Sequence, residues 1–264
     1  VFSAIAVSID SLIIASVKGL AMAGIFTFAQ YAANLIQVPQ RSITSVSAGV
    51  LSRAWKEKNY TEIDRIYSRS CINLLLMALF IFGNLWLNLL PAMQVLHIQG
   101  DYKAGIGVVF VLSMLRIIDA GTGLNQMVIN TSTFWRFDFY SGIVLFAFRL
   151  PLTYILIKKF GIIGSAFAEL TAFTVYNIIR CEFLRRKFNM QPFTLKTLYS
   201  LLLAAGAYAL SFFLLKEAGG WLGLVLRGGI FSVVMIGGTI YWNLTPDAGQ
   251  LIETVRKRID KYRS

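Results

Sequence analysis

Eight apolar stretches follow one another along almost the whole chain. A helix needs about 20 mostly apolar residues to cross a bilayer, and in lipid only helices and closed barrels satisfy their backbone polar groups. The stretches cover residues 2–17, 21–50, 72–90, 105–129, 139–157, 162–179, 198–215 and 221–244. We therefore predict an all-α integral membrane protein in which residues 1–244 form a bundle of about eight transmembrane helices.

The charged residues support this class and orient it. They make up 14% of the chain, whereas a soluble domain has about 25%. The net charge of +12 could suggest nucleic acid, but most of the Lys and Arg lie on one side of the predicted membrane. These are Arg53, Lys56, Lys58, Arg65, Arg69, Arg136, Arg180, Arg185, Arg186, Lys187, Lys196, Arg256, Lys257, Arg258, Lys261 and Arg263. By the positive-inside rule this side is cytoplasmic, so the excess charge is a topology signal and no nucleic-acid partner is expected.

Two segments outside the apolar stretches look amphipathic. Residues 61–69, with Thr61 as the N-cap, are predicted to form a short interfacial helix. Residues 245–264 are predicted to be a basic cytoplasmic tail, either bound to anionic lipid or simply solvated. The chain opens at Val1 inside an apolar stretch and without an initiator Met, which is typical of a piece of a larger protein.

Two of the apolar stretches carry polar stripes. The first stripe is Thr27, Gln30, Asn34, Gln37 and Arg41, and the second is Arg116, Asp119, Gly123, Gln126 and Asn130. The alternating spacing of three and four places the members of each stripe on one helix face. Charged side chains in the membrane normally face a bundle interior or a wet cavity, so the stripes indicate a polar path.

Arg41 is the most constrained member of the first stripe. It lies twelve residues before Arg53, hence roughly 18 Å deep, and Pro39 beside it permits a kink. It either lines a cavity or pairs with a carboxylate to hold helices together. Arg116 could likewise pair with Asp119, which lies three residues away. Gln126 and Asn130, however, extend the polar helix face beyond what an isolated Arg116–Asp119 ion pair requires.

Further charged residues lie within other apolar stretches. Asp10 either binds a coupling cation or proton, or neutralises Arg41 or Arg149. Asp119, Glu169 and Arg149 are additional coupling or charge-balancing candidates. We expect Asp10 to border one concave surface together with Arg41 and Arg116.

The chain shows little that points to an enzyme. His97 is the only histidine, and the sequence contains neither a P-loop motif nor an H-E-x-x-H motif. Cys71 and Cys181 fall near predicted cytoplasmic helix ends and show no metal-ligand spacing. We therefore expect no catalytic residues, metal or cofactor.

The order and spacing of three segments resemble a known family. Residues 116–138, which include the second stripe, resemble the tenth helix and following loop of bacterial polysaccharide flippases. Residues 159–168 resemble the Gly-rich start of the twelfth helix, and residues 24–33 resemble the seventh-to-eighth helix hairpin. These flippases belong to the multidrug/oligosaccharidyl-lipid/polysaccharide exporter superfamily. The chain is thus similar to the C-terminal half of a fourteen-helix member, but lacks the N-terminal lobe and has Ser47-Ala48-Gly49 where such proteins often have proline.

The resemblance implies transport of undecaprenyl-diphosphate-linked oligosaccharide across the bacterial inner membrane by alternating access, for surface polysaccharide biosynthesis. The partners would be this lipid-linked substrate, membrane lipids and the missing lobe. An arginine can hold a diphosphate through two hydrogen bonds, and amides can bind sugar hydroxyls. The substrate-binding candidates are Arg41, Arg116, Gln30, Asn34, Gln37, Gln126 and Asn130.

Three alternatives stay open. A multidrug/cation antiporter of the same superfamily would want a cavity dominated by acidic and aromatic residues. A membrane-embedded polysaccharide polymerase would place reactive residues in large outer loops, and the loops here are short. A structural membrane subunit would pack its polar stripes together without a cavity.

Overall fold

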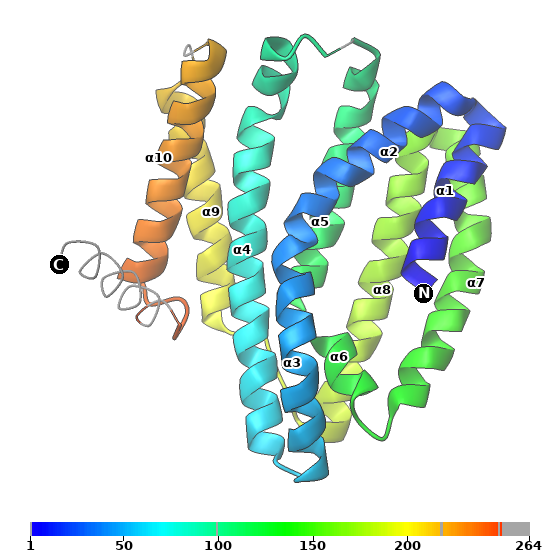
Figure 1. Ribbon diagram of the computed structural model, residues 1–264, viewed down its shortest axis with the longest axis vertical. Helices are drawn as coiled ribbons and strands as arrows, with labels where there is room; N and C mark the ends of the chain where they lie inside the picture. The colour runs from blue at the N-terminus through cyan, green and yellow to red at the C-terminus, as the bar shows by residue number, and fades with distance from the viewer. Residues whose placement is uncertain (1, 99, 217–218, 248, 250–264) are drawn as a thin grey trace.

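The computed structural model describes residues 2–98, 100–216, 219–247 and 249, and these are helical or lie in short turns (Figure 1). Among them there is no β-strand, as predicted. The α-helices are α1 (Phe2–Lys18), α2 (Leu20–Asn34), α3 (Val38–Lys56), α4 (Tyr60–Val95), α5 (Ile106–Gly121), α6 (Asn125–Asn130), α7 (Trp135–Phe160), α8 (Ile162–Phe188), α9 (Leu195–Leu214) and α10 (Gly220–Tyr241). Short 3-10 helices cover Leu35–Gln37 and Gly100–Gly105.

Six helices in the described part of the chain are long and apolar enough to cross a membrane, which confirms the all-α membrane bundle. They are α4, α5 with the turn before it, α7, α8, α9 and α10. The other two predicted spans, 2–17 and 21–50, are helical but are not among these six. The second is divided into α2 and α3 by the 3-10 turn Leu35–Gln37, because Pro39 in the first turn of α3 lacks a backbone N–H. Figure 1 shows the resulting bend between α2 and α3.

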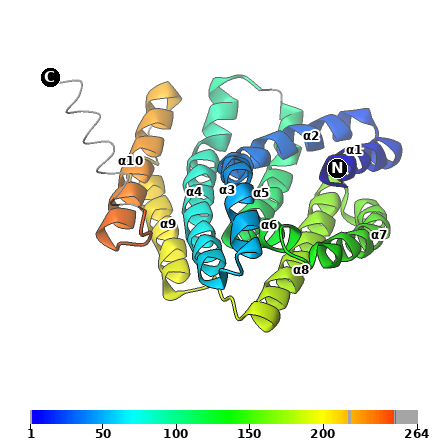
Figure 2. The ribbon, with the colours of Figure 1, turned by 60° about the horizontal axis from the view of Figure 1, so that its bottom comes forward.

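The bundle has two halves that meet at α4 and α5. On one side α9 and α10 pack against α4, and on the other α8 packs against α5 and α7 (Figures 1 and 2). The ring of Phe231 on α10 sits over Gly83 on α4, where a Cβ atom would lie only 2.0 Å from the ring. Such close approach at a small residue is how membrane helices associate without a hydrophobic driving force.

The prediction of a separate interfacial helix over residues 61–69 is wrong. These residues are the first turns of the 36-residue helix α4, because Ile63 and Tyr67 are fully buried against the bundle. The N-cap is Asn59 instead of Thr61, and its side chain accepts a hydrogen bond from the Glu62 N–H at 3.1 Å.

Only the start of the predicted tail 245–264 belongs to the described residues. Thr245 is buried, and its hydroxyl contacts the side chain of Asn73 on α4. The basic residues of this tail lie outside the described residues.

One end of the bundle is basic. The C-terminal turn of α3 carries Arg53 and Lys56, and that of α8 carries Arg185, Arg186 and Lys187. Both turns lie at the lower end of Figure 1, together with the beginnings of α4 and α7. We refer to this end as the basic end.

Candidate functional site: a polar cavity in the bundle

A polar cavity of about 880 Å³ lies where α3, α5, α7 and α8 meet. Nine of the eleven predicted site residues line it: Asn34, Gln37, Arg41, Arg116, Asp119, Gln126, Asn130, Arg149 and Glu169. Most members of the two polar stripes therefore face one common space, whereas Thr27, Gln30 and Gly123 do not line it. Gln30 and Asp10 are almost completely buried between helices and do not line it, so the expectation that Asp10 borders the same surface as Arg41 and Arg116 is wrong.

Four buried charged residues form a chain of ion pairs along one wall of the cavity. The Arg149 guanidinium contacts Asp10 and also lies 3.4 Å from Glu169 Oε2. Arg116 Nη2 lies 3.4 Å from Glu169 Oε1. Asp10 thus neutralises Arg149, one of the two partners expected from the sequence. The four charges compensate one another, which offsets the cost of burying them in the membrane.

Asp119 is held by amides and not by Arg116. It accepts hydrogen bonds from Gln37 at 3.4 Å, Gln40 at 3.0 Å and Asn177 at 3.1 Å. The expected local ion pair with Arg116 does not form, since Arg116 turns to Glu169. The three amides spread the charge of this carboxylate without neutralising it.

Among the described residues, Arg41 is the cation of the cavity without a charge partner. Its side chain lines the cavity and is exposed. Within the described residues, no carboxylate lies in salt-bridge range of Arg41. A structural role as half of an ion pair is therefore not supported, and the guanidinium can offer its donors to a ligand.

Sequence reasoning missed a second buried pair in the cavity. Arg180 Nε on α8 lies 2.6 Å from Asp138 Oδ1 on α7, and both side chains are buried. The Tyr176 hydroxyl donates to the same carboxylate oxygen at 3.0 Å. The sequence placed Arg180 among the charges of the cytoplasmic side, and the structure shows that its side chain is buried in this pair.

A spacing signal for this pair was present in the sequence. Glu169, Phe173, Tyr176 and Arg180 repeat the pattern of four, three and four on α8, and all line the cavity. The second member of this stripe is the aromatic residue Phe173, so the pattern does not indicate a polar helix face. On α7, Asp138 and Arg149 lie eleven residues apart, which is three helical turns and one face.

The second predicted stripe is divided between two helices. The helix α5 ends at Gly121, and Gly123 adopts the left-handed conformation with φ of 64°. A Cβ atom at Gly123 would lie 2.4 Å from the Cys71 sulfur and 2.9 Å from its backbone nitrogen. The break lets the chain pass close to α4, and it allows α6 to aim Gln126 and Asn130 at the cavity.

No family model, curated protein or solved structure matches this chain. Among the described residues there is also no group of three or more His, Cys, Asp or Glu that could hold a metal ion. Function is therefore inferred from the residues of the cavity.

Proposed function

We propose that this chain is part of a flippase that moves undecaprenyl-diphosphate-linked oligosaccharide across the bacterial inner membrane for surface polysaccharide biosynthesis. The observation that carries the proposal is Arg41, an exposed cation in a polar cavity within a membrane bundle, with no carboxylate partner in the described part of the chain. An arginine in that position suits a diphosphate, because its planar fork can bind two phosphate oxygens at once.

The rest of the cavity fits the remainder of such a ligand. Asn34, Gln126 and Asn130 line the same space, and their amides can donate to and accept from sugar hydroxyls. The volume of about 880 Å³ lies in the range of sites that enclose a small organic ligand.

The charge arrangement favours an anionic over a cationic ligand. The carboxylates of Asp138 and Glu169 are engaged by arginines, and that of Asp119 by three amides. A multidrug/cation antiporter would need a carboxylate free to meet the cation. We therefore rank that function second.

The proposal includes an orientation. Positive charge is retained on the cytoplasmic side of membrane proteins, so the basic end of the bundle faces the cytoplasm. The cavity-lining polar residues Gln126 and Asn130 then lie toward the cytoplasmic side, where a lipid-linked glycan assembled in the cytoplasm would enter. Facing helices of the same transporter would complete the path by alternating access.

Binding of a short prenyl diphosphate tests this function. The full chain in detergent is titrated with farnesyl diphosphate, and with farnesol as the uncharged control. Losing a hydrogen bond to a charged group costs roughly 1.5–3 kcal/mol, so Arg41→Ala is expected to weaken diphosphate binding by about ten- to a hundredfold.

The matched control is Arg53→Ala, an exposed arginine twelve residues further along the same helix and outside the cavity. It should bind farnesyl diphosphate as the unchanged chain does. Equal affinity for farnesyl diphosphate and farnesol would rule out the diphosphate role. Preferential binding of tetraphenylphosphonium, a lipophilic cation, would favour the antiporter.

A further inference from the structure

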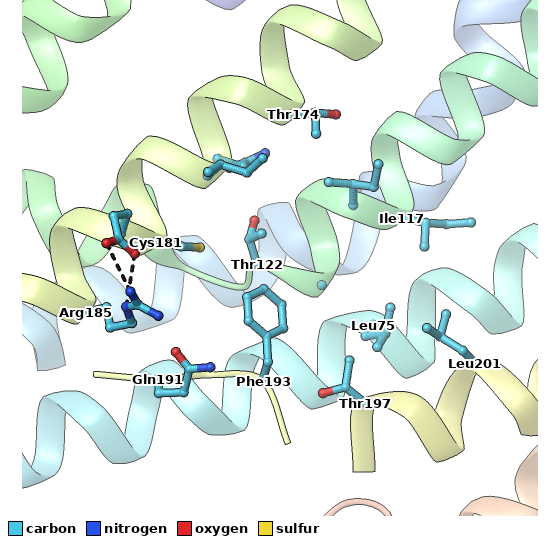
Figure 3. Close-up of a pocket in the computed structure, with 15 residues that line it drawn as sticks. Leu75, Ile117, Thr122, Thr174, Cys181, Arg185, Gln191, Phe193, Thr197 and Leu201 are labelled. Atoms are coloured by element: carbon cyan, nitrogen blue, oxygen red, sulfur yellow. Dashed lines mark hydrogen bonds and ion pairs between the residues drawn. The ribbon is translucent and has the colours of Figure 1, made fainter. Parts of the chain in front are cut away.

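A second concave site lies on the other side of the cavity wall. It is a groove of about 420 Å³ bounded by α4, α5, α8, the beginning of α9 and the segment 189–194 that joins α8 to α9 (Figure 3). We call it the α8–α9 groove. None of its lining residues was a candidate from the sequence.

The helices α5 and α8 form a wall between the groove and the polar cavity. On α8, Tyr176 and Arg180 line the cavity, whereas Asn177 and Cys181 line the groove. The wall is closed by hydrogen bonds, since Asn177 donates to Asp119 at 3.1 Å and accepts from Asn125 at 2.9 Å. A ligand in the groove is therefore separate from one in the cavity.

The groove is apolar inside and polar at one end. Leu75, Ile117 and Leu201 gather at the inner end, and Arg185 and Gln191 lie at the opposite end, as Figure 3 shows. Thr174 and Arg185 are eleven residues apart on α8, so the groove extends about 16 Å along this helix. Its polar end, with Arg185, belongs to the basic end of the bundle.

The groove also opens toward the bilayer. Ile178 on α8 and Leu201 on α9 line it from opposite sides, and they remain 61% and 43% exposed. The helix α9 packs against α4 and α10, which leaves the side toward α8 open. A hydrocarbon chain can therefore enter sideways from the membrane.

The polar end carries a positive charge excess. Glu182 lines the groove beside Arg185 and is shared by two arginines, Arg185 at 3.0 Å and Arg186 at 2.6 Å. One carboxylate thus faces two cations. Basic pockets between transmembrane helices bind the headgroups of acidic lipids.

We infer that the α8–α9 groove binds an anionic phospholipid. One acyl chain lies along Ile117, Ile178 and Leu201, and the phosphate lies against Arg185 and Gln191. The inference does not depend on the proposed flippase function, because the α5–α8 wall keeps this lipid apart from the polar cavity.

Native mass spectrometry of the full chain, with phosphatidylglycerol or phosphatidylcholine added to the detergent, tests for the site. We expect phosphatidylglycerol to be retained preferentially, and Leu201→Trp to abolish that preference by filling the groove. The control Leu202→Trp adds the same side chain at a neighbouring exposed position that does not line the groove. Equal retention of the two lipids, or equal behaviour of the two variants, would overturn the inference.

A second pair of variants tests the charge. Arg185 lines the groove and Arg186 does not, although both contact Glu182. Arg185→Gln should therefore lower phosphatidylglycerol retention severalfold, and Arg186→Gln should leave it nearly unchanged. The opposite order would place the headgroup elsewhere.

Cys181 provides a readout at the site itself, because it lines the groove and is partly exposed. In lipid nanodiscs, phosphatidylglycerol should slow its reaction with a maleimide severalfold compared with phosphatidylcholine. Farnesyl diphosphate should not relieve this protection. If it does, the groove takes the prenyl chain of the transported substrate, and the assignment to a phospholipid is wrong.

Discussion

Arg180 and Asp138 join α8 to α7 at the wall of the polar cavity, with 2.6 Å between Arg180 Nε and Asp138 Oδ1. The Arg180 guanidinium also lies 3.6 Å from the centre of the Tyr176 ring, and the Tyr176 hydroxyl donates to Asp138. Each of the three side chains contacts the other two. This closed arrangement fixes the spacing of α7 and α8 near the basic end of the cavity.

Breaking this pair should destabilise the bundle. Asp138→Asn removes the only carboxylate in contact with Arg180 among the described residues and leaves a buried, uncompensated guanidinium. Loss of one partner of a buried pair costs about 3–5 kcal/mol, which should lower the thermal unfolding midpoint in detergent by several degrees. The control is Arg186→Gln, which breaks an exposed pair and should have little effect. Equal effects of the two variants would contradict the buried role of Asp138.

The chain of ion pairs at the opposite end of the cavity predicts an order of effects. Among the described residues, Glu169 forms ion pairs with both Arg116 and Arg149, whereas Asp10 forms one with Arg149 alone. Glu169→Gln should therefore lower the thermal unfolding midpoint more than Asp10→Asn, because it leaves Arg116 without a carboxylate. The double variant Glu169→Gln, Arg116→Met should regain part of the loss, since it removes the stranded charge. A double variant less stable than Glu169→Gln alone would contradict this account.

The fold class and most of the cavity could be predicted from sequence because both depend on periodicity. The apolar stretches exclude a soluble fold, and the spacing of Gln37, Arg41, Arg116 and Asp119 predicts shared faces. Periodicity places residues on a face, but it does not select partners between helices. The sequence could therefore not tell that Arg116 contacts Glu169 rather than Asp119, which is three residues away.

The misassigned elements have other physical causes. The charges of residues 62–69 indicated a membrane surface, yet Ile63 and Tyr67 on the other face bury completely and continue α4. Arg180 lies only five residues before Arg185. Sequence position alone therefore does not distinguish the buried ion pair of Arg180 from the exposed ion pair of Arg185.

The helix break at Gly123 gives a sharp test of local packing. Gly123→Ala forces a side chain into the left-handed conformation, which costs about 1–2 kcal/mol, and places Cβ against Ser70 and Cys71. We expect a marked loss of thermal stability. Gly24→Ala is the control, because Gly24 is helical with no atom within 4 Å of the added Cβ, and there alanine should be neutral or stabilising by up to about 1 kcal/mol. Similar losses in both variants would show that the contact between Gly123 and α4 is unimportant.

The polar cavity should be filled with water, whereas the outer face of α7 should be in lipid. Ser45 on α3 lines the cavity, and Val144 on α7 is 68% exposed without lining it. Ser45 is eight residues before Arg53 and Val144 is nine after Trp135, so each lies a little over two helical turns from a residue near the basic end of the bundle. In a Cys181→Ser background, which leaves only the buried Cys71, we expect Ser45→Cys in proteoliposomes to react quickly with a water-soluble methanethiosulfonate reagent.

Val144→Cys should react at least tenfold more slowly, because the reactive thiolate does not form in hydrocarbon. Farnesyl diphosphate should slow the reaction at position 45, which lies one helical turn from Arg41, and farnesol should not. Equal rates at the two positions would contradict a hydrated cavity. Protection by farnesol as well as by farnesyl diphosphate would show that the cavity recognises the prenyl chain rather than the charge.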